Sequence, residues 1–196
     1  MPIKSRHIHI YVIAVCLVAV AIDLAMALSM DRQSLLTTTI SDLAAGDYAS
    51  AQDFGLILVA IGVTLTGLAI WRSGSGDWPD GMAAALFAIA GPLIVLISLY
   101  EAYSKTSPQS PVIHYWAVGA IGLSISIALG LLAWARGDAH PVFRWGTGIA
   151  AAIFLAAGAA TFGVSNQIIG LVERFAAVSL VLWLIGFHSA RLASRD

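Results

Sequence analysis

The sequence predicts an all-α membrane protein, a polytopic bundle of six transmembrane helices. Of its 196 residues, 59% are hydrophobic and only 11% are charged, against about 45–50% and about 25% in an average soluble domain. Six apolar runs of spanning length follow one another along the chain, and none alternates with a period of two as a barrel strand does. Because lipid cannot satisfy backbone polar groups, these runs are expected to be helices.

Composition also excludes several classes of protein. Ten basic and eleven acidic residues give a net charge of -1, which leaves no basic surface for nucleic acid. The single cysteine, Cys16, excludes an intramolecular disulfide and a cysteine-based metal cluster. We therefore expect the lipid bilayer as the main partner, with a second membrane protein or a second copy of the chain as further candidates.

The six predicted spans form one domain over residues 1–196. They cover residues 8–30, 53–71, 81–103, 112–135, 142–164 and 168–191. The first connection, 31–52, is the longest, and its segment Thr37–Leu43 is expected to lead into a short surface helix. Ser41 or Asp42 would cap that helix through a side-chain oxygen, and the helix would form a lid over the outer end of the bundle.

The first span also resembles a secretory signal peptide. Basic residues precede it, and Ala25-Met26-Ala27 has the form of a cleavage site. Its apolar run is about twenty residues long rather than the usual 7–15, and it contains Asp23. We therefore interpret it as the first transmembrane helix.

The positive charges predict the orientation of the bundle. With six spans, the side that carries both termini holds more basic residues than the other side, which holds Arg32, Lys105 and Arg174. The residues on the side of the termini are Lys4, Arg6, Arg72, Arg136, Arg144, Arg191 and Arg195. By the positive-inside rule, both termini should be cytoplasmic. The protein is thus expected to be a multi-pass protein of the cell (inner) membrane.

Two charged residues are predicted to lie at membrane depth. At a rise of 1.5 Å per residue, Asp23 falls about 6 Å, and Arg174 about 9 Å, to the outer side of the midplane. An ion pair between the first and last helices is the preferred arrangement, with Glu101 as the main rival partner for Arg174. Such a pair is either a structural clamp or part of a site for a ligand, a proton or an ion.

Further polar residues gather at the outer end of the bundle. Ser41, Asp42, Glu101, His114 and Glu173 provide carboxylates and one imidazole, which could bind a divalent cation or act as acid and base. No H-x-x-x-H or H-E-x-x-H spacing occurs, so no metal site is predicted. A solvated acidic rim is the simpler interpretation, and capping is favoured over a nucleophilic role for Ser41.

The remaining histidines form no cofactor motif. His9 and His188 both fall at inner helix ends, where a haem between them is geometrically conceivable. No sequence pattern supports a haem site, so no cofactor is expected.

Glycines are expected to let neighbouring helices approach closely. They are concentrated in the fourth and fifth spans, at Gly119, Gly122, Gly146, Gly148, Gly158 and Gly163.

The order of the polar motifs resembles a known family. Ile40-Ser41-Asp42-Leu43 precedes the second span, Tyr100-Glu101 closes the third, Ile113-His114 opens the fourth, and Gly170-Leu171-Val172-Glu173-Arg174 opens the sixth. This order resembles the six-span prokaryotic membrane family catalogued as domain of unknown function nine-nine-eight. The resemblance implies a six-helix bundle with polar residues at its outer end, matched by Ser41, Glu101, His114 and Arg174. It implies no established activity, and Asp23 is not part of the family pattern.

Three functions are compatible with these features. The favoured one is a non-catalytic membrane protein that binds a lipid or another hydrophobic ligand, or that is an accessory subunit of a membrane complex. The first alternative is a small proton- or ion-coupled transporter that uses Asp23, Glu101 and Arg174. The second is an outer-face membrane hydrolase built around His114, with Glu101, Asp42 or Glu173. Whether the protein is an enzyme is left open, and an enzyme is not favoured.

Overall fold

The computed structural model describes residues 5–29, 35–44, 49–73, 76–100, 109–135 and 141–194, and all regular structure in these ranges is helical. Six long helices and one short helix make up this part of the chain. They are α1 (Ser5–Ser29), α2 (Ile40–Ala44), α3 (Ala49–Ser73), α4 (Trp78–Leu99), α5 (Ser110–Ala135), α6 (Pro141–Ala160) and α7 (Ile169–Ala193).

The six long helices are each long and apolar enough to cross a membrane. Their apolar segments have 20 to 25 residues, which corresponds to about 30–38 Å of helix and therefore matches a hydrocarbon core of about 30 Å. The predicted all-α bundle of six spans is confirmed, and the protein is an integral multi-pass membrane protein.

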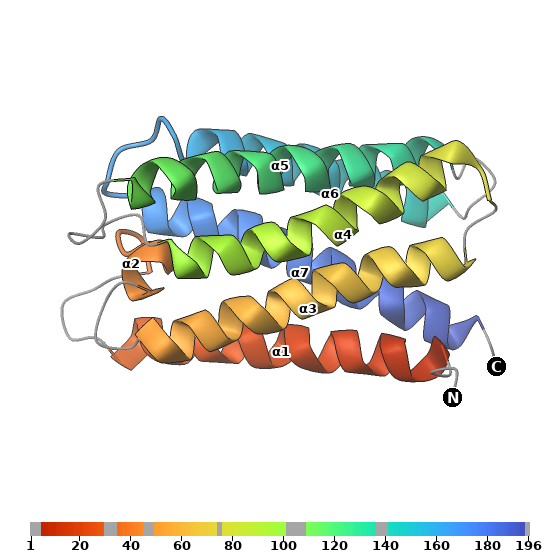
Figure 1. Ribbon diagram of the computed structural model, residues 1–196, viewed down its shortest axis with the longest axis horizontal. Coiled ribbons are helices and arrows are strands. Elements are labelled where there is room, and N and C mark those ends of the chain that lie inside the picture. The colour runs from red at the N-terminus through yellow and green to blue at the C-terminus, as the bar shows by residue number, and fades with distance from the viewer. Residues whose placement is uncertain are drawn as a thin grey trace.

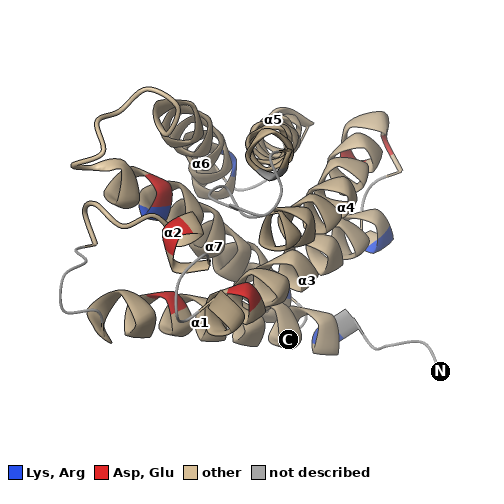
Figure 2. Ribbon diagram, turned by 60° about the vertical axis from the view of Figure 1, so that its left-hand side comes forward, with Lys and Arg blue, Asp and Glu red and all other residues tan. Residues whose placement is uncertain are grey.

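The long helices are arranged as a closed ring. Each packs against two neighbours in the order α1, α3, α4, α5, α6, α7, and α7 returns to α1. Both chain termini lie at one end of the bundle and α2 lies at the other end (Figure 1). We call these the terminal end and the α2 end. Few residues of the ribbon are charged (Figure 2).

The half of the bundle nearer the terminal end is filled by aromatic side chains. The ring of Trp183 stacks between those of Phe87 and Phe187, at centroid distances of 5.6 Å and 5.2 Å. The indole nitrogen of Trp183 donates a hydrogen bond to Oγ1 of Thr147 at 3.0 Å. Stacked rings with a satisfied indole give this half a densely packed core.

Helices α3 and α4 approach one another closely. A Cβ atom at Gly67 would lie 2.6 Å from the carbonyl oxygen of Ala84, so only glycine fits there. The prediction that glycines of the fourth and fifth spans have this role is wrong. Added Cβ atoms meet nothing within 4 Å at Gly119, Gly122, Gly146, Gly158 and Gly163, and the nearest atom at Gly148 is 3.8 Å away. A glycine permits close packing only where it faces a neighbouring helix. Amino-acid composition does not show which way a glycine faces.

Two helices, α4 and α6, end four residues before the predicted ends of their spans. Helix α4 ends at Leu99, because the backbone of Tyr100 leaves the helical region, and residues 101–103 lie outside the described ranges. Helix α6 ends at Ala160, four residues before the predicted end, in a tightened turn in which Gly163 N–H donates to Ala160 O. Hydropathy alone does not register such turns, because their residues are still apolar.

The orientation can be tested with single cysteines. Cys16 is buried, so Cys16→Ala provides a background without a thiol. Ser165 at the α2 end and Ser194 at the terminal end are both exposed. In intact cells, a membrane-impermeant maleimide should label Ser165→Cys, whereas Ser194→Cys should be labelled only after permeabilisation. Labelling of both cysteines in intact cells would contradict the fold. Labelling of Ser194→Cys in intact cells and of Ser165→Cys only after permeabilisation would contradict the predicted orientation alone.

Candidate functional site

An ion pair joins the first and last helices at the α2 end. Nε of Arg174 on α7 donates to Oδ2 of Asp23 on α1 at 2.9 Å, and a second guanidinium nitrogen lies 3.4 Å from Oδ1. The side chains are only 8% and 16% exposed. This is the arrangement that the predicted depths favour, and it places two opposite charges side by side inside the bundle.

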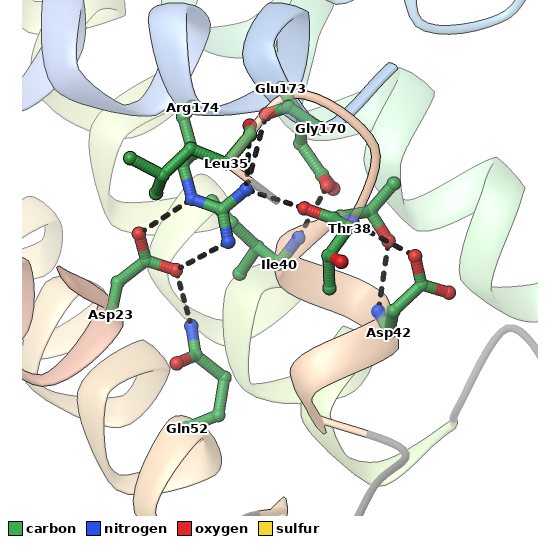
Figure 3. A network of polar contacts seen from close by, with 10 residues as sticks. Asp23, Leu35, Thr38, Ile40, Asp42, Gln52, Gly170, Glu173 and Arg174 are labelled. Carbon is green, nitrogen blue, oxygen red and sulfur yellow. Dashed lines mark hydrogen bonds and ion pairs between the residues drawn. The ribbon is translucent and has the colours of Figure 1, made fainter. Parts of the chain in front are cut away.

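The third guanidinium nitrogen of Arg174 holds the chain between α1 and α2. Its Nη1 atom donates to the carbonyl oxygens of Leu35, Thr38 and Gly170 (Figure 3). All three nitrogens of the guanidinium therefore have acceptors within the protein. Arg174 therefore joins α1, α7 and the segment before α2.

The first turn of α7 makes further contacts with the segment 35–40. Leu171 N–H donates to Leu36 O at 3.1 Å, and Ile40 N–H donates to Oε2 of Glu173 at 2.7 Å. Gly170 allows the backbones to meet, because a Cβ there would lie 2.7 Å from the carbonyl carbon of Thr38 and 2.9 Å from its nitrogen. Together with Arg174, these contacts fix the position of α2.

Helix α2 is capped differently from the prediction. Oγ1 of Thr39 accepts from Asp42 N–H at 2.9 Å, and Oδ2 of Asp42 accepts from Thr39 N–H at 2.8 Å. This reciprocal pair is a capping box in which Thr39 is the N-cap and Asp42 is the third residue of the helix. Asp42 thus takes part in capping, but the expectation that Ser41 or Asp42 is itself the N-cap is wrong.

The hydroxyl of Ser41 instead lies between a histidine and a carboxyl group. Oγ of Ser41 is 3.1 Å from Nε2 of His114 on α5 and 3.3 Å from Oε1 of Glu173 on α7. Nδ1 of His114 is 2.8 Å from the carbonyl oxygen of Tyr100. Tyr100 is the C-cap residue of α4, and carbonyls at a helix C-terminus have no partner within their own helix. Side chains from α5 and α7 thus converge on the hydroxyl carried by α2.

A cavity of about 390 Å³ lies on the axis of the ring, beneath α2. Every helix of the described chain contributes to its wall, which is mostly aliphatic and includes Leu56, Val59, Ile94 and Ile121. Its polar residues are gathered near α2: they are Asp23, Ser41, Gln52, His114, Thr161, Glu173 and Arg174. The cavity is therefore amphipathic, with an apolar body and a polar end.

Gln52 and Thr161 are polar residues of this cavity that the sequence prediction missed, and Gln52 contacts the charged pair. It lies in the first turn of α3, is only 3% exposed, and donates from Nε2 to Oδ1 of Asp23 at 3.5 Å. Its Oε1 atom is buried and has no hydrogen-bond partner among the residues that the structure describes. The sequence could have indicated Gln52, because its amide side chain lies one residue before the predicted start of the second span. The observed helix α3 includes this residue.

Other predicted residues are not part of this cluster. Glu101 lies outside the described residues. His9 and His188 contact one another in the other half of the bundle, with their Nδ1 atoms 2.7 Å apart and Nε2 of His188 2.9 Å from Thr66 Oγ1. At that separation the two rings leave no space for a haem between them. Among the described residues, no group of three His, Cys, Asp or Glu side chains is placed to hold a metal ion.

A second hollow, of about 410 Å³, is lined by α3 and α4 around Thr64 and Pro92. None of the predicted site residues lines it. The cavity beneath α2 is therefore the candidate site.

Comparison with known families agrees with this architecture. A family model described as "Protein of unknown function (DUF998)" matches residues 13–189. The chain belongs to the DUF998 family. The match confirms the resemblance seen in the sequence motifs and includes every residue of the DUF998 site described above. No curated protein and no solved structure matches the chain.

Removing one member of the Asp23–Arg174 pair should destabilise the fold. In Asp23→Asn, the buried guanidinium loses its counter-charge, which costs about 3–5 kcal/mol when one partner of a buried pair is lost. Thermal unfolding in detergent measures the effect, with the exposed Arg144→Met as the control for loss of an arginine. The double variant Asp23→Leu/Arg174→Met should lose less than the sum of the single variants. Unchanged stability in Asp23→Asn would show that the pair is not a clamp.

Gly170 should be intolerant of a side chain. Gly170→Ala forces the Thr38 backbone away from α7 and should lower the stability by about 1–3 kcal/mol, the usual cost of overpacking. Gly186→Ala is the matched control on the same helix, because a Cβ there meets nothing within 4 Å. The control should be neutral or slightly stabilising, since alanine favours helix more than glycine. Equal unfolding temperatures for the two variants would contradict the close contact.

Proposed function

We propose that the protein binds a lipid-like amphiphile in the cavity beneath α2, with one apolar chain and a small uncharged polar head. One observation carries the proposal. The cavity has an aliphatic body, and its polar end contains a buried hydrogen-bond acceptor that no described residue pairs. Ligand sites are mostly apolar concavities with a few converging polar groups, and they occupy about 300–1,000 Å³. At about 390 Å³, this cavity is near the lower limit, which favours a single chain over a diacyl lipid.

The polar end of the cavity favours an uncharged head group. Arg174 already has Asp23 and three carbonyl oxygens as partners, so it is not free to bind an anion. Within the described part of the chain, Oε1 of Gln52 is an acceptor without a donor, and a buried acceptor of this kind is costly unless it is paired. A hydroxyl or amide N–H of the ligand would supply that donor.

The predicted orientation places this site in the outer leaflet of the cell (inner) membrane. Positive charges on the side of the termini favour a cytoplasmic terminal end, so the α2 end would face outward. The same geometry does not favour a transporter in which Asp23 and Arg174 relay protons. In such a relay Arg174 would have to break its hydrogen bonds to α1, to the segment before α2 and to α7 in each cycle.

Cross-linking can test whether an amphiphile occupies the cavity. A monoacylglycerol with a diazirine in its chain should cross-link to residues of the cavity wall. Gly122 on α5 lines the cavity and has open space around it, so Gly122→Leu should fill the cavity and reduce cross-linking about tenfold, equivalent to about 1.4 kcal/mol.

Gly130→Leu is the matched control. Gly130 is also on α5, is exposed and has open space around it, so the added side chain should leave cross-linking unchanged. Undiminished cross-linking in Gly122→Leu would contradict the proposal. So would cross-links confined to outward-facing side chains such as Trp116 and Leu123, which are 77% and 58% exposed.

A further inference from the structure

The hydroxyl of Ser41 has the surroundings of an activated nucleophile. Such a group needs a base within hydrogen-bond reach, and the base in turn needs a group that orients it. Nε2 of His114 is 3.1 Å from Ser41 Oγ, and Nδ1 of the same ring is 2.8 Å from the carbonyl oxygen of Tyr100. Ser41 is thus placed as the nucleophile, His114 as the base and the carbonyl of Tyr100 as the group that orients the base.

The carbonyl of Tyr100 determines which nitrogen of His114 carries the proton. A carbonyl oxygen only accepts hydrogen bonds, so Nδ1 of His114 must be the donor. In the neutral ring, Nε2 then has a lone pair directed at Ser41. This is the tautomer that a general base requires, and it is fixed by a backbone group of another helix.

The hydroxyl is also available for chemistry and close to the ligand site. Thr39 and Asp42 cap α2, so Ser41 is not needed for capping. Ser41 and His114 both line the cavity at its polar end. An acyl chain that fills the apolar body would place its carbonyl group where the aliphatic wall ends, which is beside Ser41.

We propose that Ser41 and His114 hydrolyse a carboxylic ester of a single-chain amphiphile, an inference that rests on the proposed binding function. Ser41 Oγ forms a bond to the acyl carbon as its proton passes to Nε2 of His114. The bond to the leaving alcohol then breaks, and the alcohol takes the proton from His114. Water releases the acyl group from Ser41 by the same two steps, giving a fatty acid and the free serine.

Glu173 and Tyr100 are positioning residues in this scheme. Oε2 of Glu173 accepts from Ile40 N–H at 2.7 Å, and Oε1 lies 3.3 Å from Ser41 Oγ. Glu173 therefore fixes the backbone before Ser41. The hydroxyl of Ser41 has one proton, which it can donate either to Nε2 of His114 or to Oε1 of Glu173. Tyr100 orients His114 through its carbonyl, so the side chain of Tyr100 is not required.

Fluorophosphonate probes test the nucleophile directly, because the serine oxygen bonds to phosphorus as fluoride leaves. The full-length protein is treated in detergent with a long-chain alkyl fluorophosphonate or with the short diisopropyl fluorophosphate, and the adduct is located by peptide mass spectrometry. We expect labelling at Ser41. The long-chain probe should react about tenfold faster, because burial of each methylene favours binding.

Two variants separate reactivity from folding. His114→Gln retains a hydrogen-bonding side chain but not a base, and it should slow labelling about 100-fold, a typical contribution of general-base catalysis, with the unfolding temperature retained. Ser126→Ala is the control, because Ser126 is a buried serine with no hydrogen-bond partner in the described ranges, and labelling should be unchanged. Since labelling of the wild-type protein is itself informative, the test stands even if His114→Gln misfolds.

The outcomes distinguish this inference from the proposed function. No labelling of Ser41 by either probe, with monoacylglycerol still cross-linked in the cavity, would overturn the hydrolase and retain the binding protein. Equal rates with both probes would overturn the single-chain ligand on which the inference depends. Labelling at Ser41 with a preference for the long chain, lost in Gly122→Leu, would support both.

Discussion

The structure depends on the burial of one guanidinium group. Arg174 lies on a helix that spans the bilayer and is 7% exposed, where neither water nor lipid can supply acceptors. Its acceptors come from Asp23 on α1 and from carbonyl oxygens of Leu35, Thr38 and Gly170. Because two of these carbonyls belong to the segment before α2, satisfying Arg174 requires that segment to lie across the end of the bundle.

The placement of the candidate site follows from this requirement. Arg174 and Glu173 are adjacent on α7 and bind different partners: Arg174 holds α1 and the segment 35–38, and Glu173 holds the start of α2. With α2 fixed at both points, the Ser41 hydroxyl meets His114 across the ring. The charged pair therefore does not contact Ser41 itself, but it fixes the segment that leads into the helix carrying Ser41.

The sequence predicted the fold and the charged residues better than it predicted the contacts of the site. Hydropathy gives the number of membrane spans, because the length of an apolar run is a local property of the sequence. The predicted depths of Asp23 and Arg174 in the membrane were enough to favour an ion pair between them. The contact of Ser41 with His114 depends on how each helix is rotated about its axis, which hydropathy does not specify. Thr39 was missed as the N-cap because Thr37, Thr38 and Thr39 are all capable of capping.

A comparison of the two halves of the bundle favours a functional role for the α2 end. In the terminal half, three buried polar side chains bind one another: Thr66 donates to Gly62 O, so it accepts from His188, and His188 in turn accepts from His9. Aromatic rings fill the space around them. The α2 half has the same kind of helices, but it keeps a cavity and an unpaired Gln52 oxygen within it. Both features cost stability, and a bound amphiphile would remove both costs at once.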